Sequence, residues 1–137
     1  EGRGMNSQIV MEAGLEGRAE IVVGDAHLAS AIGSGGVGVF STPSMIALME
    51  SAAVNAVARA LLDGQTTVGT LVNVQHMAAT PPGMRVRAYA RLLKVHGRLL
   101  EFEIWAEDDA ERIGEGTHQR AVVDLARFEQ KVTAKRG

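Results

Sequence analysis

Glu50 is the side chain of this sequence whose surroundings most clearly demand an explanation. It interrupts an apolar segment that runs from Met45 to Val54. Burying an unpaired carboxylate costs on the order of several kcal/mol, so Glu50 needs a partner or a chemical task. Arg59 lies nine positions later and points to about the opposite side of a helix, which excludes it as an intrahelical partner. Glu50 is therefore either a general base, a residue that orients one, or a structural carboxylate paired across a sheet or subunit interface.

His76 and Thr42 are the other two candidates for catalysis. His76 stands near the end of a predicted strand, where an imidazole can transfer protons near neutral pH or can be a structural histidine with satisfied hydrogen bonds. Thr42 precedes Pro43 at a helix start, where it could be a simple N-cap. Its hydroxyl would also lie beside backbone N–H groups that stabilise negative charge, such as a thioester oxyanion.

Two further positions qualify for binding the substrate. His118 and Arg120 share one face of a later strand by the period of two, so Arg120 could pair with Glu50, hold an anion or lie in solvent. Gly69 within a strand predicts a bulge or a close approach of a ligand to the backbone.

The helices and strands that must position these residues are predicted from turn and capping residues and from the periodicity of apolar residues. Residues 17–23 are expected to form a strand, and a glycine-rich mobile loop is expected at 29–38. A long apolar helix is predicted over 43–62, followed by strands at 66–78, 84–95, 98–107 and 112–125. A short C-terminal segment has apolar residues at helical spacing: Leu125, Phe128 and Val132.

This order contains no βαβ repeat and predicts an α+β domain in which one antiparallel sheet wraps around one central helix. One sheet around one helix leaves a sheet edge and apolar surface uncovered. We therefore expect a homodimer at least, and tetramers remain an option. Residues 5–137 are assigned to this single domain. Residues 1–4 are set aside as an added or disordered extension before Met5.

Composition narrows the function classes. The formal net charge of -2 is spread along the chain, which argues against nucleic acid as a partner. No apolar run approaches a membrane span and no signal peptide is evident, so a cytoplasmic protein without a membrane partner is the simplest expectation. The chain has no cysteine, and its four histidines lack the short spacing of a metal motif. No metal is expected, and the motifs GxSxG and HExxH are absent.

Three blocks of the sequence resemble the fluoroacetyl-CoA thioesterase family of hot-dog proteins. They are Phe40-Ser41-Thr42 leading to Leu48-Met49-Glu50, His76 followed by Ala78-Ala79-Thr80-Pro81-Pro82-Gly83, and Gly114 to Val122. The resemblance covers about residues 38 to 135. In the loop before the helix, this sequence has Gly33-Ser34-Gly35-Gly36 where the fluoroacetyl-selective enzyme has aromatic gating residues.

The resemblance implies a hot-dog dimer that hydrolyses a short acyl-CoA thioester, with no cofactor beyond the coenzyme A of the substrate. It places the catalytic threonine, glutamate and histidine at Thr42, Glu50 and His76. It assigns acyl-end binding to Gly69 and Arg120, and Phe40 and Gly36 are further candidates for binding the substrate. Two rival functions are a noncatalytic acyl-CoA-binding protein and a hot-dog acyl-CoA dehydratase.

Overall fold

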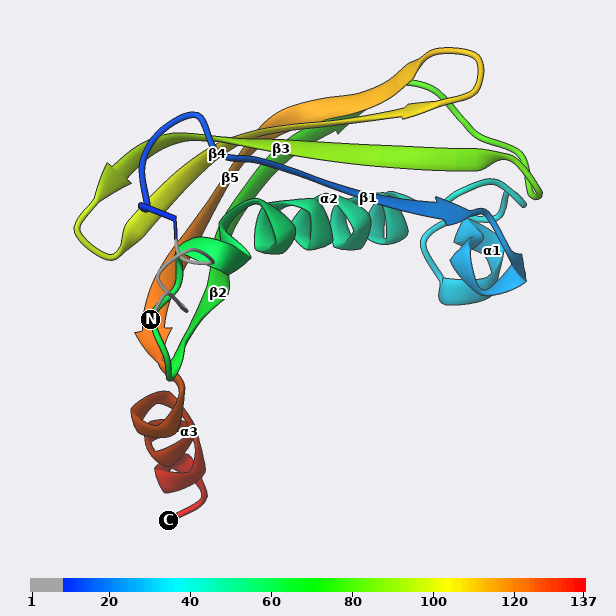
Figure 1. Ribbon diagram of the computed structural model, residues 1–137. Coiled ribbons are helices and arrows are strands. Elements are labelled where there is room, and N and C mark those ends of the chain that lie inside the picture. Colours follow the sequence, from blue (N-terminus) through cyan, green and yellow to red (C-terminus); the bar gives the residue numbers. More distant parts are fainter. Residues whose placement is uncertain (1–8) are drawn as a thin grey trace.

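The computed structural model describes residues 9–137 and contains one curled antiparallel sheet with a long helix against its concave face (Figure 1). Residues 1–4, expected to be an added or disordered extension, lie outside the described part. The elements follow in the order β1 (Glu16–Val22), α1 (Ala29–Ile32), α2 (Thr42–Val57), β2 (Gln65–His76), β3 (Arg85–His96), β4 (Leu99–Asp108), β5 (Arg112–Asp124) and α3 (Leu125–Thr133). The predicted α+β class is confirmed, and so is the order of the five strands and the long helix.

The five strands are arranged in the order β1-β3-β4-β5-β2, and every neighbouring pair is antiparallel. Strand β2 therefore forms one outer edge although it follows the helix in sequence. Along β4 and the first part of β3, buried side chains alternate with more exposed ones, which is the pattern of a sheet covered on one side. The core between sheet and helix is filled by large side chains from both: Phe40, Met45, Met49, Leu92, Leu100, Phe102, Ile104 and Ile113.

Helix α2 is shorter than predicted and is covered on one face only. It ends at Val57 and a 3-10 turn, Ala58–Ala60, continues it, whereas the sequence predicted a helix to Leu62. Its outer side remains open in the single chain, since Val54 is 40% exposed. Strand β1 crosses the helix so closely that a Cβ at Gly17 would collide with the backbone of Ala52 and Ala56.

The predicted glycine-rich loop at 29–38 is partly wrong, because its first residues form α1. Ala29–Ile32 makes one helical turn that ends at Gly33 in the left-handed conformation, with φ of 75°. Backbone hydrogen bonds from Ala29 to Val39 and from Ser30 to Val37 close the remainder into a compact loop.

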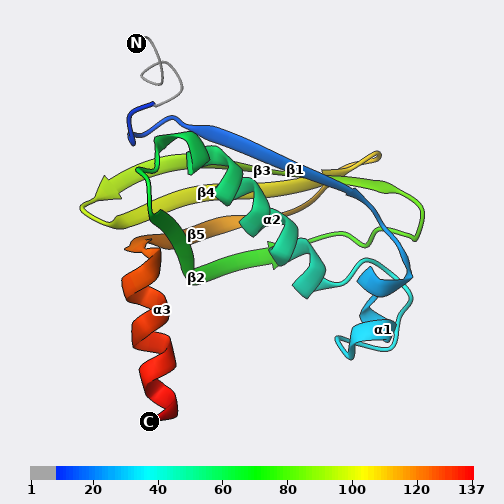
Figure 2. The same cartoon turned by 60° about the horizontal axis from the view of Figure 1, so that its bottom comes forward.

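The two ends of the molecule differ in shape. Helix α1 lies beside the N-terminus of α2 at one end, whereas α3 leaves the opposite end and projects past β2 (Figure 2). Among residues 9–137, no helix has the length and hydrophobicity that crossing a membrane requires.

Candidate active site

Thr42 is the first residue of α2 but does not cap it. The cap is Ser41, whose Oγ accepts a hydrogen bond of 3.1 Å from the backbone N–H of Ser44. The alternative in which Thr42 is a simple N-cap is therefore wrong. The Thr42 hydroxyl is left free for other chemistry at the positive end of the helix dipole.

The Thr42 hydroxyl instead meets His76. Thr42 Oγ1 lies 2.7 Å from Nδ1 of His76, a short hydrogen bond between the start of α2 and the end of β2. A hydroxyl that donates to a neutral imidazole is the arrangement by which a base activates an oxygen nucleophile. The geometry joins two of the three predicted catalytic residues.

The second ring nitrogen of His76 is unusual. Nε2 is buried and has no hydrogen-bond partner in the described chain. Burial lowers the pKa of His76 below its ordinary value. The nearby backbone of Ala78 acts on this pKa in the opposite direction, but it makes no hydrogen bond to Nε2. The neutral imidazole that results can accept a proton at Nδ1 while Nε2 carries a hydrogen with no acceptor.

A pocket of about 300 Å³ opens beside this pair. The volume matches the lower end of small-molecule sites. The pocket has Thr42 and His76 in its wall, together with residues from α1, the loop after it and the segment after β2: Ala29, Ser34, Gly35, Val37, Val39, Phe40, Ser41, Met77, Ala78 and Ala79. Of the predicted binding residues, Phe40 lines this pocket and Gly36 does not.

Glu50 and Arg120 form a second polar cluster further along α2. The guanidinium NH1 of Arg120 lies 3.3 Å from Glu50 Oε2, which confirms the predicted option of a pair between them. Arg120 also donates to the Thr67 hydroxyl at 2.9 Å and to the Thr67 carbonyl at 3.1 Å. The Arg120 side chain is only 8% exposed, whereas Glu50 is 39% exposed and so less buried than its apolar neighbours suggested.

His118 completes this cluster and was not among the predicted site residues. Its Nδ1 lies 2.7 Å from the Leu71 carbonyl, and its Nε2 lies 3.2 Å from Arg120 NH1. A ring that donates through Nδ1 and accepts through Nε2 is neutral. Burial is the main cause that lowers the pKa of His118, and the neighbouring Arg120 adds to the shift. The period of two that places His118 beside Arg120 was the available signal for it.

Gly69 lies at the centre of this cluster, at an irregularity in the pairing of β2 with β5. A Cβ there would come within 2.6 Å of Glu50 Oε2 and 3.3 Å of Arg120 NH1. The irregularity confirms the predicted bulge, and it is the Glu50 carboxylate that fills the space beside Gly69. Only glycine allows the helix carboxylate to lie directly on the strand.

The three predicted catalytic residues thus fall into two groups within one chain. Thr42 and Glu50 are eight positions apart on α2, which corresponds to about 12 Å along the helix axis. Glu50 contacts Arg120 and Gly69, whereas His76 contacts Thr42. Among residues 9–137, no group of three acidic or histidine side chains could hold a metal ion.

Comparison with known proteins gives the chain its class. A family model described as fluoroacetyl-CoA-specific thioesterase matches residues 23–126. The fluoroacetyl-CoA thioesterase of Streptantibioticus cattleyicolor is 46% identical over 97 residues, which make up 71% of this chain and 70% of that protein.

Solved structures agree in fold. The fluoroacetyl-CoA thioesterase FlK superposes with a TM-score of 0.86 at 37% identity, over 93% of this chain and 98% of that one. A thioesterase superfamily member from Thermus thermophilus gives a TM-score of 0.84 at 28% identity, over 90% of this chain and 92% of that one. The sheet, the helix and these relatives define a thioester hydrolase of the hot-dog superfamily. Within that superfamily, the chain belongs to the family of fluoroacetyl-CoA-specific thioesterases.

Proposed function

We propose that this enzyme hydrolyses short-chain acyl-CoA thioesters and that Thr42 and His76 form its reactive pair. The observation that carries the proposal is the 2.7 Å hydrogen bond from Thr42 to His76 in the wall of a pocket of about 300 Å³. The small volume suits a short acyl group. Further support comes from relatives: one acts on fluoroacetyl-CoA, and a variant of FlK has been solved in complex with acetyl-CoA.

The chemistry follows from the neutral state of His76. Its Nδ1 takes a proton from the Thr42 hydroxyl, or from a water in the same place, as that oxygen attacks the thioester carbonyl carbon. The negative charge that develops on the carbonyl oxygen is stabilised by the positive end of the α2 dipole, where Thr42 lies. The imidazolium then returns its proton to the departing CoA thiolate. If Thr42 is the nucleophile, a second round with water releases the acid.

The site also requires a second copy of the chain. Strand β2 is a sheet edge, and Leu71 and Val72 in its exposed centre are 45% and 36% exposed. An exposed edge with apolar residues is a template for pairing with another strand. We propose that two subunits join β2 to β2 around a twofold axis and so form one continuous sheet.

This pairing would bring the two polar groups together. The exposed positions of β2 extend from Gly69 to Gln75, with Val74 partly buried between them, and antiparallel pairing about their middle, Val72, sets Gly69 opposite the partner's Gln75. Because Glu50 lies on Gly69, its carboxylate would then approach the partner's His76. The buried N–H at Nε2 would gain the acceptor that it lacks within one chain. Threonine, histidine and glutamate would form a nucleophile, a base and an orienting carboxylate across the interface.

Release of free thiol from a panel of acyl-CoAs of increasing chain length tests the activity. The expected result is hydrolysis of the shortest members, with rates that fall as the chain outgrows the pocket. Hydration of an enoyl-CoA without thiol release would instead indicate a dehydratase, and tight binding without turnover would indicate a sensor. Sedimentation at micromolar concentration tests the assembly, and a folded monomer would contradict the proposed dimer.

A further inference from the structure

Helix α3 is the part of the molecule that the proposed chemistry leaves unexplained. It begins at the end of β5, and none of its residues is buried in the single chain. It projects past the β2 edge rather than packing on the sheet (Figure 2). A nine-residue helix with no buried face gains little from its own chain, so its position calls for a partner or ligand.

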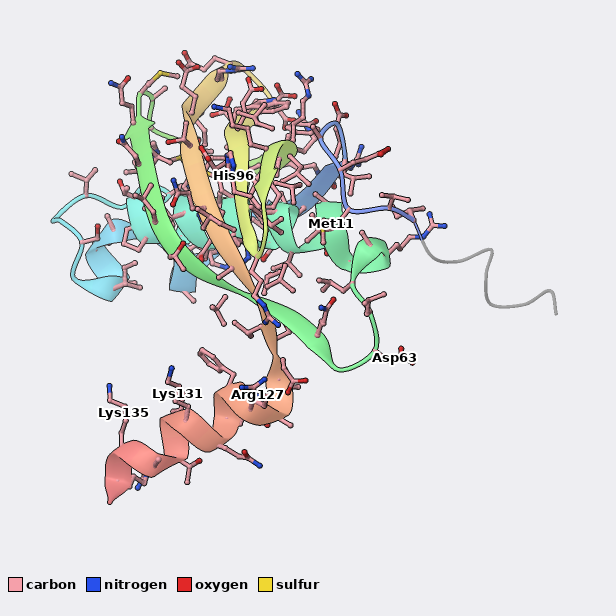
Figure 3. All side chains as sticks on the ribbon, turned by 90° about the vertical axis from the view of Figure 1, so that its left-hand side faces the viewer. Met11, Asp63, His96, Arg127, Lys131 and Lys135 are labelled. Carbon is pink, nitrogen blue, oxygen red and sulfur yellow. The ribbon has the colours of Figure 1, made fainter. Side chains whose placement is uncertain are left out.

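One side of α3 is basic. Arg127 and Lys131 of α3 lie four residues apart and share a side of the helix, and Lys135, in the 3-10 turn Ala134–Arg136 that continues α3, follows at the same interval (Figure 3). All three are exposed, and among residues 9–137 none forms an ion pair with a carboxylate. Glu129, the acidic residue of the helix, lies on the other side.

This basic side borders a hollow on the surface. The hollow has a volume of about 640 Å³. Its cations are Arg127 and Lys131 of α3 and Arg98 of the β3–β4 turn. It is lined by Arg98, Val123, Asp124, Arg127, Phe128, Gln130 and Lys131. The acidic member, Asp124, is already engaged because its carboxylate caps α3 by accepting from the Arg127 N–H at 2.9 Å. The hollow therefore presents three cations around a partly buried aromatic ring, that of Phe128.

The proposed dimer sets this hollow beside the active-site pocket of the other subunit. Within one chain, Gln65 at the start of β2 pairs with Asp124, and the N–H of Leu125 donates to the Gly64 carbonyl. Pairing of β2 about Val72 sets Gln65 opposite the partner's Ala79. In the described chain Ala79 lines the reactive pocket. The start of α3 is then separated from the partner's pocket rim by one strand, or about 10 Å.

We infer that the hollow on α3 binds the phosphorylated end of the acyl-CoA whose acyl group enters the partner's pocket. This inference rests on the proposed function and dimer. The 3′-phosphate and diphosphate of coenzyme A carry several negative charges, which the guanidinium groups of Arg98 and Arg127 and the ammonium of Lys131 complement. The ring of Phe128 offers a face on which the adenine can stack. Each active site thus combines a reactive pocket from one subunit with a phosphate clamp from the other.

The test compares ligands that share the thiol end but differ in phosphates. Binding of CoA, 3′-dephospho-CoA and pantetheine to the parent and to the double variant R127A/K131A is measured by calorimetry at low salt. Turnover of acetyl-CoA and acetyl-pantetheine is measured on the same preparations. The matched control, R18A/K94A, removes two exposed cations from β1 and β3.

We expect R127A/K131A to weaken CoA binding and raise the KM for acetyl-CoA about tenfold, with kcat and pantetheine binding unchanged. The parent should bind CoA more tightly than 3′-dephospho-CoA, and salt should reduce that preference. Equal CoA binding by parent and variant, or an equal loss for pantetheine, would overturn the inference. If the parent binds CoA through these cations but releases no thiol, the phosphate site is supported and the proposed hydrolysis is refuted.

Discussion

The two polar groups beneath the sheet differ in how completely their hydrogen bonds are satisfied. Around Arg120, the guanidinium donates to Glu50, His118 and Thr67, and His118 reaches the Leu71 carbonyl. At the other group, His76 binds Thr42 through one nitrogen, and its other nitrogen is buried with no partner among residues 9–137. Folding alone accounts for the first arrangement, because buried polar groups are normally paired. The second leaves a donor available for chemistry or for a partner subunit.

The two histidines of these groups, His76 and His118, also differ in role. Both have a pKa lowered mainly by burial, so the shift alone does not identify the base. His118 has both nitrogens engaged and lies against a guanidinium, whereas His76 has a hydroxyl at Nδ1 and lines the pocket. The base is therefore assigned by its contacts.

The largest expected effect is on turnover when His76 is removed. His76→Ala should lower kcat by about 10² to 10⁴, the usual contribution of a positioned base. Its thermal midpoint should stay close to that of the parent because the ring makes few bonds. The control is His96→Ala, which removes an exposed hairpin histidine (Figure 3) and should leave kcat within twofold, on the order of experimental error. Activity of His76→Ala within a few-fold of the parent would return His76 to a structural role.

Arg120 should show the reverse pattern, with its main effect on stability. Arg120→Met removes donors to Thr67 and leaves Glu50 and His118 without their cation. The expected loss in free energy of unfolding is about 2 to 4 kcal/mol, measured by urea denaturation. Arg91→Met serves as the control, because its ion pairs are exposed and should contribute less than about 1 kcal/mol. Equal losses of unfolding free energy in Arg120→Met and Arg91→Met would show that the Arg120 cluster stabilises the fold no more than an exposed ion pair does.

The pH profile sharpens the assignment of the base. Protonated His76 cannot accept a proton, so kcat/KM should rise with pH and level off once the imidazole is neutral. Burial lowers the pKa of His76 below its ordinary value, whereas the partner's Glu50 carboxylate in the proposed dimer favours the imidazolium, so Glu50→Gln should move the midpoint of this acid limb to lower pH. An unchanged midpoint in the residual activity of Glu50→Gln would show that this carboxylate does not act on His76.

Stability has a related dependence on pH. The unfolded chain takes up a proton on His118 at a higher pH than the folded chain does. The free energy of unfolding should therefore be fully present above about 6.5 and should decrease as the pH falls below it. Urea midpoints across this range check the sign.

The smallest effect is expected at the loop before α2. Gly36 has open space around the position of a Cβ and no positive φ, so Gly36→Phe should leave the thermal midpoint nearly unchanged. An aromatic ring near Ser34 and Gly35 should shift the ratio of kcat/KM between short and longer acyl groups several-fold, on the order of 1 kcal/mol. An unchanged ratio across the panel would count against a gating role for this loop.

Much of the fold could be predicted from the sequence, because residues that favour helix starts and turns mark the ends of the helices and strands. Pro43 and the clustered hydroxyls marked the start of α2, and His96-Gly97 marked the β3–β4 turn. The end of α2 was predicted five residues too late, since Ala58 to Leu62 has no residue that forbids a helix. Helix α1 was missed because the glycines after it dominated the pattern.

The candidate site was predictable in its residue types but not in its grouping. Periodicity placed Arg120 where it could reach Glu50, and the structure confirms that contact. No local pattern could show that Thr42 is free of capping, because Ser41 and Thr42 are both able to cap a helix. The separation of Glu50 from His76 depends on how β2 crosses the helix, which is a tertiary property.

The central claim is that Glu50 of one subunit acts on His76 of the other, and a mixing experiment tests it directly. Glu50→Gln and His76→Ala are purified separately, shown to be folded and nearly inactive, and then mixed in equal amounts under conditions that exchange subunits. If the site is shared, each mixed dimer has one intact site, and activity should recover to about a quarter of the parent value at random exchange. If all three residues act within one chain, the mixture should remain as inactive as its components. That result, with subunit exchange verified, would contradict the shared site.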